Sequence, residues 1–236
     1  MTRRIAILPA RGGSKRIPHK NIRDFCGKPM ISYILSAAAA SRLFEVIHVS
    51  TDSADVADVV TKLGFAPAFS RPQELADDFT PLMPVLKHVV AEYQRRGQTF
   101  DQVCLLYACA PMIEASDLQS AANIFDAAIG TEGLIAVTNY DSPIEWAFDL
   151  VGHELHPVQP GMFLVRSQDL KTRHHSTGTF AFFSTARVLR DGPPSDRNYF
   201  GYVLPRHKAL DIDNEEDWDF AERLYRGSMV MARKTP

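Results

Sequence analysis

Apolar residues in the first half of the chain gather in short runs, separated by longer stretches of mixed apolar and polar positions. The runs have the length and the Val, Ile and Leu content of buried strands, and they predict strands at 5–8, 46–50, 103–107 and 134–138. Apolar residues at helical spacing predict helices over 30–43, 53–63, 84–96 and 116–128. This alternation indicates an α/β fold, a Rossmann-like and mostly parallel sheet sandwiched by helices.

Capping residues and turns refine the limits of these elements. Ser53 is a suitable N-cap for the second helix, which should stop at Gly64, and Ser116 or Asp117 should cap the fourth. A further short strand is expected at 66–70. In such a sheet the loops that follow the strands lie along one edge, where ligands bind.

The strand–helix pattern breaks after Tyr140. The segment 142–168 is rich in Pro, Gly, His and aromatic residues and has no helical period, so we expect an inserted hairpin or arm over about 140–176. A strand resumes at 179–184, a closing helix is expected over 214–225, and 227–236 should form a loose tail. The chain, 1–236, is thus predicted to be one domain with an inserted arm.

The composition is that of an ordinary globular protein, with 45% hydrophobic residues and a formal net charge of -2. Such a charge does not indicate a nucleic-acid partner. Apolar runs fall short of the roughly 20 residues that a membrane span needs, and the N-terminus lacks the features of a secretory signal. Three cysteines without metal-ligand spacing agree with reduced thiols, and we expect a cytoplasmic protein with no membrane partner.

The first predicted strand leads directly into a basic loop with two adjacent glycines. From Ala10 to Asn21 the sequence is ARGGSKRIPHKN. Glycine lets a ligand approach the backbone closely or allows positive φ, and successive free N–H groups form an anion-binding concavity. Together with the four cations Arg11, Lys15, Arg16 and Lys20, these groups suit a triphosphate. The residues predicted to bind it are Ala10, Arg11, Gly12, Gly13, Ser14, Lys15 and Lys20.

Two common phosphate motifs do not match this loop. The P-loop needs Gly-Lys-Ser or Gly-Lys-Thr, whereas Lys15 follows Ser14, and the dinucleotide fingerprint needs a third glycine that is absent here. The alternative without a ligand is a solvated basic turn.

Two carboxylates near the C-terminus, Asp211 and Asp213, flank Ile212. Alternate residues of an extended segment point the same way, so both carboxylates should face one side, where they suit Mg²⁺ bridged to phosphates. The alternative is a helix cap by Asp213 or Asn214, with Glu216 completing a capping box. Both interpretations can hold, because a cap does not need Asp211.

Weaker candidates stand at other predicted strand ends. They include 50–52, Arg71 and Tyr107, each of which also fits a cap or turn. His174 and His175 invite a metal site, but no third ligand has suitable spacing, and a sugar contact by His175 is the better hypothesis.

Taken together, these segments resemble the cytidylyltransferases that activate sialic acids, the CMP-sialic acid synthetase family, and most closely its pseudaminic acid branch. The resemblance spans about 5–225. Its motifs are 5–21, VSTD at 49–52, RPQEL at 71–75 and DID at 211–213, with branch-specific similarity at 25–31, 77–80, 166–170 and 202–206.

The resemblance implies that CTP and a nonulosonic acid give a CMP-sugar and pyrophosphate. It implies that Arg11, Lys15 and Lys20 bind the triphosphate and that Asn21 and Arg71 hold the cytidine. Asp211 and Asp213 would bind Mg²⁺, with Asp211 among the catalytic residues. The family is usually a homodimer whose arm reaches the neighbouring subunit.

The sugar side of the family pattern is less regular in this chain. Sialic-acid members tend to carry glutamine where Tyr107 stands, and tyrosine agrees with the pseudaminic acid branch. The stretch 174–179 keeps only the His and Gly of that branch. The sugar-binding residues expected from these segments are Tyr107, His175, Thr177 and Thr179. Legionaminic acid, N-acetylneuraminic acid and Kdo are the alternative acceptors, and a non-catalytic nucleotide-binding protein is the alternative to an enzyme.

Overall fold

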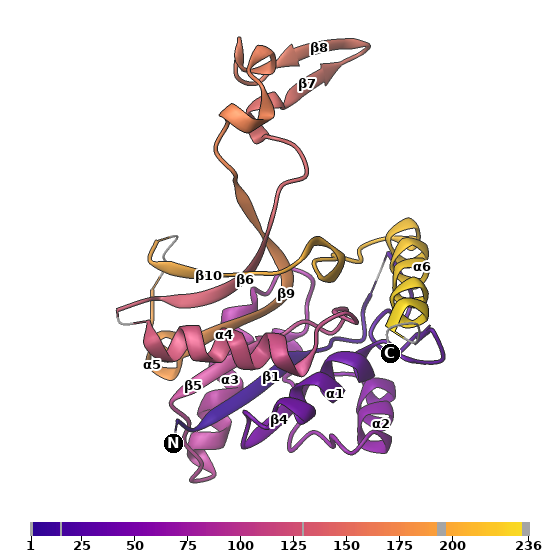
Figure 1. The fold of residues 1–236 in the computed structure, drawn as a ribbon. Helices are drawn as coiled ribbons and strands as arrows, with labels where there is room; N and C mark the ends of the chain where they lie inside the picture. The colour runs from indigo at the N-terminus through magenta and orange to yellow at the C-terminus, as the bar shows by residue number, and fades with distance from the viewer. Residues whose placement is uncertain (1, 15, 129, 193–196, 233–236) are drawn as a thin grey trace.

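Six strands form the central sheet of the computed structural model, which describes residues 2–14, 16–128, 130–192 and 197–232 (Figure 1). Their order is β10-β6-β9-β5-β1-β4, and only β9 runs antiparallel to its neighbours. The strands are β1 (Arg4–Pro9), β4 (Val46–Ser50), β5 (Gln102–Leu106), β6 (Gly133–Asn139), β9 (His174–Ser184) and β10 (Tyr199–Val203). The expectation of a mostly parallel sheet is confirmed, although β10 was not predicted.

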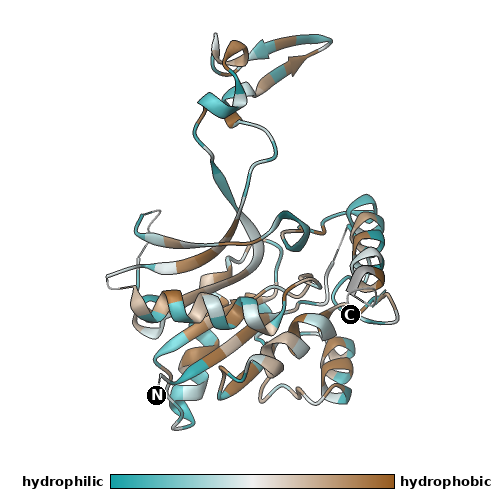
Figure 2. Cartoon of the chain, in the orientation of Figure 1, coloured by the Kyte–Doolittle hydropathy of each residue, from teal (hydrophilic) through white to brown (hydrophobic). Residues whose placement is uncertain are grey.

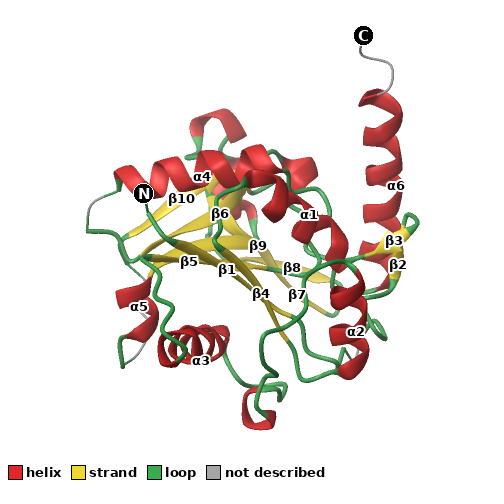
Figure 3. Ribbon diagram, turned by 90° about the horizontal axis from the view of Figure 1, so that it is seen from below, coloured by secondary structure: helices red, strands yellow, loops and turns green. Residues whose placement is uncertain are grey.

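Helices cover both faces of the sheet, as Figure 3 shows. One face carries α1 (Ile31–Ser41), α2 (Ala54–Lys62) and α4 (Ala115–Ala127), and the other carries α3 (Leu82–Arg95) and α5 (Thr185–Leu189). Strand β1 is buried on both faces. Ala6 and Leu8 pack in the core on the side of α1, α2 and α4, while Ile5 and Ile7 pack in the core on the side of α3 and α5. A continuous apolar run is what a strand buried on both sides requires.

The closing helix α6 (Glu215–Ala232) packs at the end of the sheet against the short hairpin β2 (Asp24–Phe25) and β3 (Lys28–Pro29). Trp218 and Tyr225 meet the Phe25 ring edge-on, at centroid distances of 5.5 and 5.6 Å. The helix continues through Gly227, so the prediction of a loose tail is wrong up to residue 232. A single glycine costs a helix only about 1 kcal/mol relative to alanine. The rest of that tail, 233–236, lies outside the described residues.

Two other local predictions are corrected. The segment 66–70 is not a strand; it carries Pro67, which lacks an N–H to pair with the edge strand β4. The cap of α4 is Glu114, not Ser116 or Asp117, because the Asp117 carboxylate accepts a hydrogen bond from the Glu114 N–H at 2.9 Å and completes a capping box. The Ser53 cap of α2 is confirmed by a 3.4 Å bond from the Val56 N–H.

The segment after Tyr140 forms an arm. Strands β6 and β9 pair beyond the sheet as far as Asn139 and His174, and a hairpin of β7 (Phe148–Val151) and β8 (Glu154–Pro157) lies far from the body (Figure 1). Hydrophobic residues on this hairpin are open to solvent (Figure 2), with Leu150 67% and Leu155 61% exposed. Short 3₁₀ turns complete the chain: 73–75, 144–146, 162–164, 167–169 and 206–208.

None of the described helices is both long enough and apolar enough to cross a membrane.

Candidate active site

A cavity of about 430 Å³ opens at the ends of β1 and β5, where the loops after the parallel strands meet. The basic loop lines one side of it and the Asp211–Asp213 segment another. The lining includes Arg11, Ser14, Lys20, Asn21, Arg71, Tyr107, Asp211 and Asp213. These are residues that the sequence placed at separate strand ends, and the fold brings them to one cavity.

The two glycines of the basic loop have different surroundings. A Cβ on Gly12 would lie 2.9 Å from the Cβ of Ser53, so only glycine fits there, while a Cβ on Gly13 would meet nothing within 4 Å. Neither glycine has positive φ, so that part of the expectation is wrong. The close contact of Gly12 is with Ser53, and the close approach of a ligand stays a prediction. Two hydrogen bonds hold the loop in place. The Ala10 N–H donates to the Ser50 carbonyl at 2.9 Å, and the Gly12 N–H donates to the Asp52 carboxylate at 3.2 Å.

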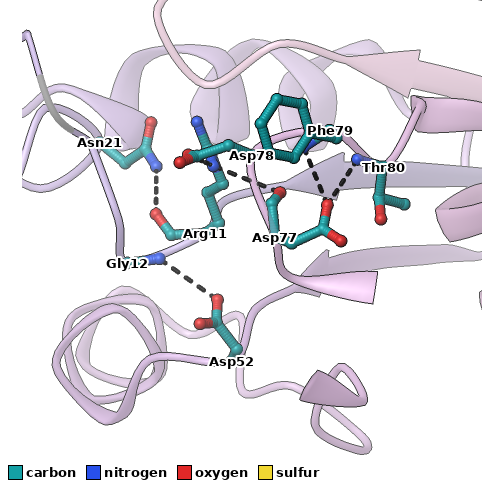
Figure 4. Close-up of polar contacts among 8 residues, drawn as sticks. All are labelled: Arg11, Gly12, Asn21, Asp52, Asp77, Asp78, Phe79 and Thr80. Atoms are coloured by element: carbon teal, nitrogen blue, oxygen red, sulfur yellow. Dashed lines mark hydrogen bonds and ion pairs between the residues drawn. The ribbon is translucent and has the colours of Figure 1, made fainter. Parts of the chain in front are cut away.

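Asn21 closes the loop on itself. Its Nδ2 donates to the carbonyl of Arg11 at 3.1 Å (Figure 4), and its Oδ1 lies 3.9 Å from Sγ of Cys109. Burial raises the pKa of Cys109 to about 12, so the thiol stays protonated and can act as this donor. Asn21 therefore holds the loop in shape as well as lining the cavity.

The loop cations already have carboxylate partners. Arg11 forms an ion pair with Asp78 and also donates to the carbonyl of Asp77 at 3.3 Å (Figure 4). Arg16 and Lys20 approach Oδ1 of Asp213 at 2.9 and 3.4 Å. Lys15, predicted to bind the triphosphate, lies outside the described residues.

The segment 76–80, which partners Arg11, was not assigned a role from the sequence. Oδ1 of Asp77 accepts hydrogen bonds from the N–H groups of Phe79 at 2.8 Å and Thr80 at 2.6 Å (Figure 4). The Thr80 side chain and these N–H groups hold the pKa of Asp77 below its usual range. This turn brings Asp78 to Arg11 and leaves the Phe79 ring 91% exposed. Asp77, two and three residues before the N–H groups that it accepts from, is the signal that could have indicated such a turn.

The two carboxylates flank the buried Ile212, as expected of an extended segment, and both line the cavity. The cap of α6 is formed without them, because Asn214 Oδ1 accepts from the Asp217 N–H at 3.0 Å and Asp217 accepts from the Asn214 N–H at 3.0 Å. The capping interpretation thus holds for Asn214, with Asp217 in place of Glu216, and leaves Asp211 and Asp213 available to the cavity.

The carboxylate of Asp211 has a shifted pKa. Partial burial raises its pKa, and the negative charge of Asp213 raises it further. An ideal Cβ on Gly178 would lie 3.8 Å from its Oδ2, so this glycine of β9, with φ +60°, keeps the space beside the carboxylate open. Gly178 was not predicted as a site residue.

Arg71 lines the cavity with a largely buried side chain, and the residue is only 7% exposed. Its Nη2 donates to the carbonyl of Ser50 at 2.5 Å and its Nε to the Ser50 hydroxyl at 3.1 Å. Burial lowers its pKa, an effect that Asp52 opposes and Arg11 reinforces.

A family model described as Cytidylyltransferase matches residues 5–226. The chain belongs to the cytidylyltransferase family. It is 35% identical over 223 residues to the pseudaminic acid cytidylyltransferase of Campylobacter jejuni. The matched residues cover 94% of this chain and 96% of that protein. The chain is 27% identical over 227 residues to the CMP-N,N'-diacetyllegionaminic acid synthase of Legionella pneumophila, with 93% and 95% covered.

A solved structure of CMP:2-keto-3-deoxy-manno-octonic acid synthetase complexed with CTP shares the fold. The TM-score is 0.69 at 17% identity, over 96% of this chain and all of that one. The family resemblance and the fold class predicted from the sequence are therefore confirmed.

Within this cytidylyltransferase fold, the four predicted sugar-binding residues separate. Tyr107 lines the cavity, and its N–H donates a hydrogen bond to the Thr179 carbonyl at 3.0 Å. Burial raises the pKa of the Tyr107 phenol, and the charge of Asp211 raises it further. His175 lines a second cavity at the base of the arm, and its ring lies 4.7 Å from that of Tyr140. Thr177 and Thr179 are buried with their hydroxyls 2.7 Å apart, and neither is among the described residues lining either cavity.

An irregularity in β9 explains this separation. The pairing of β9 with β6 shifts between Ile135 and Val137, so that residues 176–181 of β9 span only two steps of β6. Such a bulge, with Gly178 at positive φ inside it, interrupts the alternation of side chains. A sugar contact for His175, Thr177 and Thr179 remains a prediction; the structure shows protein partners for the threonine hydroxyls, with Ala136 as a further acceptor for Thr177 at 3.1 Å.

Proposed function

We propose that this protein transfers the cytidylyl group of CTP to a nonulosonic acid, pseudaminic acid, and releases pyrophosphate. The observation that carries the proposal is the meeting of the basic loop with Asp211 and Asp213 at one cavity. The substrate assignment is supported by the 35% identity to a pseudaminic acid cytidylyltransferase over nearly the whole of both chains. Tyr107 at the cavity agrees with it.

In this reaction the anomeric hydroxyl of the sugar attacks the α-phosphorus of CTP in line. The new oxygen–phosphorus bond forms as the bond between the α-phosphorus and the bridging oxygen breaks. Pyrophosphate leaves with that oxygen, and the hydroxyl loses its proton. Chemistry of this kind depends mostly on positioning and on neutralising charge. Arg11, Lys15 and Lys20 would stabilise the charge that develops on the pyrophosphate.

For this to happen, the loop cations must exchange their protein partners for phosphate. Arg11 would leave Asp78, and Lys20 and Arg16 would turn from Asp213 towards the triphosphate. Gly13 offers open backbone for a phosphate oxygen to approach, and Asn21 and Arg71 would hold the cytidine. Ala10, Gly12 and Ser14 would shape the phosphate-binding turn.

Mg²⁺ is the metal that the carboxylates fit best. It is usually bound by one or two carboxylates together with substrate phosphates, and Asp211 and Asp213 form such a pair. Within the described chain, no side chain or N–H group donates a hydrogen bond to Asp211, whose raised pKa reflects burial and the neighbouring charge of Asp213. A cation there would relieve this unfavourable charge. When bound, Mg²⁺ polarises the phosphate under attack.

We further propose that the arm pairs with a second copy of the chain. Leu150, Val151 and Leu155 on its hairpin are each more than 60% exposed, which an isolated chain would leave in water. Burying this hairpin against a neighbouring subunit would produce a homodimer. A cytoplasmic location is also part of the proposal and rests on three free cysteines.

Turnover with a panel of nucleotides and acids tests the proposed function. Pyrophosphate release is measured with CTP, UTP, ATP and GTP against pseudaminic, legionaminic and N-acetylneuraminic acids and Kdo. We expect turnover with CTP and pseudaminic acid above all other pairs. Preference for another acid would replace the acceptor. No release from any pair, with CTP binding retained, would favour a non-catalytic nucleotide-binding protein.

A further inference from the structure

The side chain of Arg71 is fixed from a segment that has little regular structure of its own. Residues 66–72 run beside the edge strand β4, and a hydrogen bond from the Arg71 N–H to the Thr51 carbonyl at 2.8 Å joins the two backbones. Two prolines, Pro67 and Pro72, remove N–H groups from this stretch. Its position against the sheet therefore depends heavily on side chains.

Two residues before Arg71, Phe69 stacks on His48. The ring centroids lie 4.4 Å apart with the planes at 29°, and His48 is itself two residues before Ser50, the partner of Arg71. In the strand β4 the side chains of His48 and Ser50 point to the same side, and Phe69 and Arg71 contact them in turn. The stack of Phe69 on His48 and the hydrogen bonds of Arg71 to Ser50 are thus successive contacts between the same two segments.

The surroundings of the stack hold both rings in place. Nδ1 of His48 lies 3.2 Å from the hydroxyl of Tyr93, and the guanidinium of Arg96 lies 4.8 Å from the centroid of Phe69. Nε2 of His48 is buried and has no hydrogen-bond partner among the described residues. The imidazole is therefore held in this position by its ring face and by one nitrogen.

We propose that the His48–Phe69 stack positions Arg71. Through Arg71, the stack sets the affinity of the site for CTP without itself touching the nucleotide. The inference rests on the proposed function, because it assumes that Arg71 serves the bound cytidine. His48 and Phe69 are positioning residues. Removing the Phe69 ring frees the 66–72 segment from β4 and lets the Arg71 guanidinium move away from Ser50.

A double-mutant cycle tests the proposal. The dissociation constant of CTP is measured by titration calorimetry for wild type, Phe69→Ala, Arg71→Ala and the double variant. We expect Phe69→Ala to weaken CTP binding about tenfold, and to have no further effect once Arg71 is alanine. The KM for the sugar should change less than twofold, because the stack lies on the nucleotide side.

Conservative and matched variants separate positioning from general stability. His48→Phe keeps an aromatic face for Phe69 and should bind CTP within twofold of wild type, whereas His48→Ala should resemble Phe69→Ala. Phe44→Ala removes another partly buried phenylalanine, which does not line the cavity and whose ring stacks on that of Phe182 at a centroid distance of 6.4 Å. This variant should lower thermal stability without changing CTP affinity. Phe69→Leu replaces Phe69→Ala if the alanine variant does not fold.

The outcomes are distinguishable. Wild-type protein that does not bind CTP contradicts the proposed function itself. Wild-type binding with unchanged affinity in Phe69→Ala, or equal effects of Phe69→Ala with and without Arg71, overturns the positioning role alone.

Discussion

The ammonium group of Lys20 lies 3.4 Å from Oδ1 of Asp213, although the two residues are 193 positions apart. Lys20 belongs to the loop after the first strand, and Asp213 precedes the closing helix. The contact joins the two halves of the proposed site. It also places a cation and a carboxylate where a metal-bound triphosphate would separate them.

The carboxylates should be required for turnover and not for folding. We expect Asp211→Asn and Asp213→Asn to lower kcat on the order of 100-fold or more, because they remove carboxylates proposed to hold Mg²⁺, the cation that would balance the phosphate charge. Pyrophosphate release as a function of Mg²⁺ concentration measures the effect, and circular dichroism checks the fold. Asp219→Asn removes an exposed carboxylate from α6 and is the matched control. Equal activity in all three variants would contradict the assignment.

The ion pair between Arg11 and Asp78 should compete with the nucleotide. We expect Asp78→Asn to tighten CTP binding in the absence of Mg²⁺ by about 3- to 10-fold, since it removes negative charge beside an incoming polyanion. The gain should shrink at high salt, because screening weakens the repulsion. Titration calorimetry at two ionic strengths measures both. Asp58→Asn on α2 makes the same change of net charge elsewhere on the surface. Weaker binding by Asp78→Asn would show that Asp78 helps to hold the ligand.

Alanine substitutions of the two loop glycines should have different effects, one on stability and the other on CTP binding. Gly12→Ala places a Cβ 2.9 Å from that of Ser53 and should cost about 1–3 kcal/mol of unfolding free energy in urea. Ser53→Gly should restore most of the loss, because glycine at an N-cap costs only about a few tenths of a kcal/mol. Gly13→Ala meets no neighbour and should leave stability unchanged while weakening CTP binding. A stable Gly12→Ala protein, or Gly13→Ala with full CTP affinity, would argue against the loop geometry described above.

His48 should make the fold sensitive to acid. Burial lowers the pKa of His48 to about 4, and the charges of His88, Arg71 and Arg96 add to the effect, while Tyr93 contacts the ring. The pKa in the unfolded chain is about 6.5. Stability is therefore complete above pH 6.5 and is lost as the pH falls towards 4, because the unfolded chain takes up the proton first.

Between pH 7 and pH 4.5 this one group should account for about 2 to 3 kcal/mol of unfolding free energy. Urea titrations of wild type and His48→Phe at both pH values measure it as the difference between the two acid losses. The same loss in both proteins would mean that His48 is already protonated in the fold or does not contribute.

The positions of the buried strands along the chain could be predicted because each is a short apolar run followed by a turn. Val46–Ser50 has the predicted limits, and the basic loop and Asp211 meet because both follow strands or extended segments at one edge of the sheet. Elsewhere, two local signals were given the wrong weight. The segment 66–70 has strand-like residues, but Pro67 lacks an N–H group for pairing, and α6 passes Gly227 because one glycine is too weak a stop.

The sugar side was harder to predict for a physical reason. His175, Thr177 and Thr179 would share one face of a regular strand, but the bulge around Gly178 turns His175 to the second cavity and the threonines inwards. A glycine inside a strand pattern is a hint of such a bulge and does not say where the side chains go. The Arg11–Asp78 pair joins loops 67 positions apart, which no local pattern reports.

The fate of the α-phosphate of CTP distinguishes transfer of the cytidylyl group to the sugar from hydrolysis of CTP and from simple binding. CTP that carries radioactive phosphorus at the α position is incubated with Mg²⁺, pseudaminic acid and the wild-type protein, and the products are separated by chromatography and counted. We expect the label to appear in a CMP-sugar, with one unlabelled pyrophosphate released for each conjugate, and we expect Asp211→Asn to form almost none. Label that remains in CTP or CDP, or that appears as free CMP without a sugar conjugate, would contradict the proposed transfer.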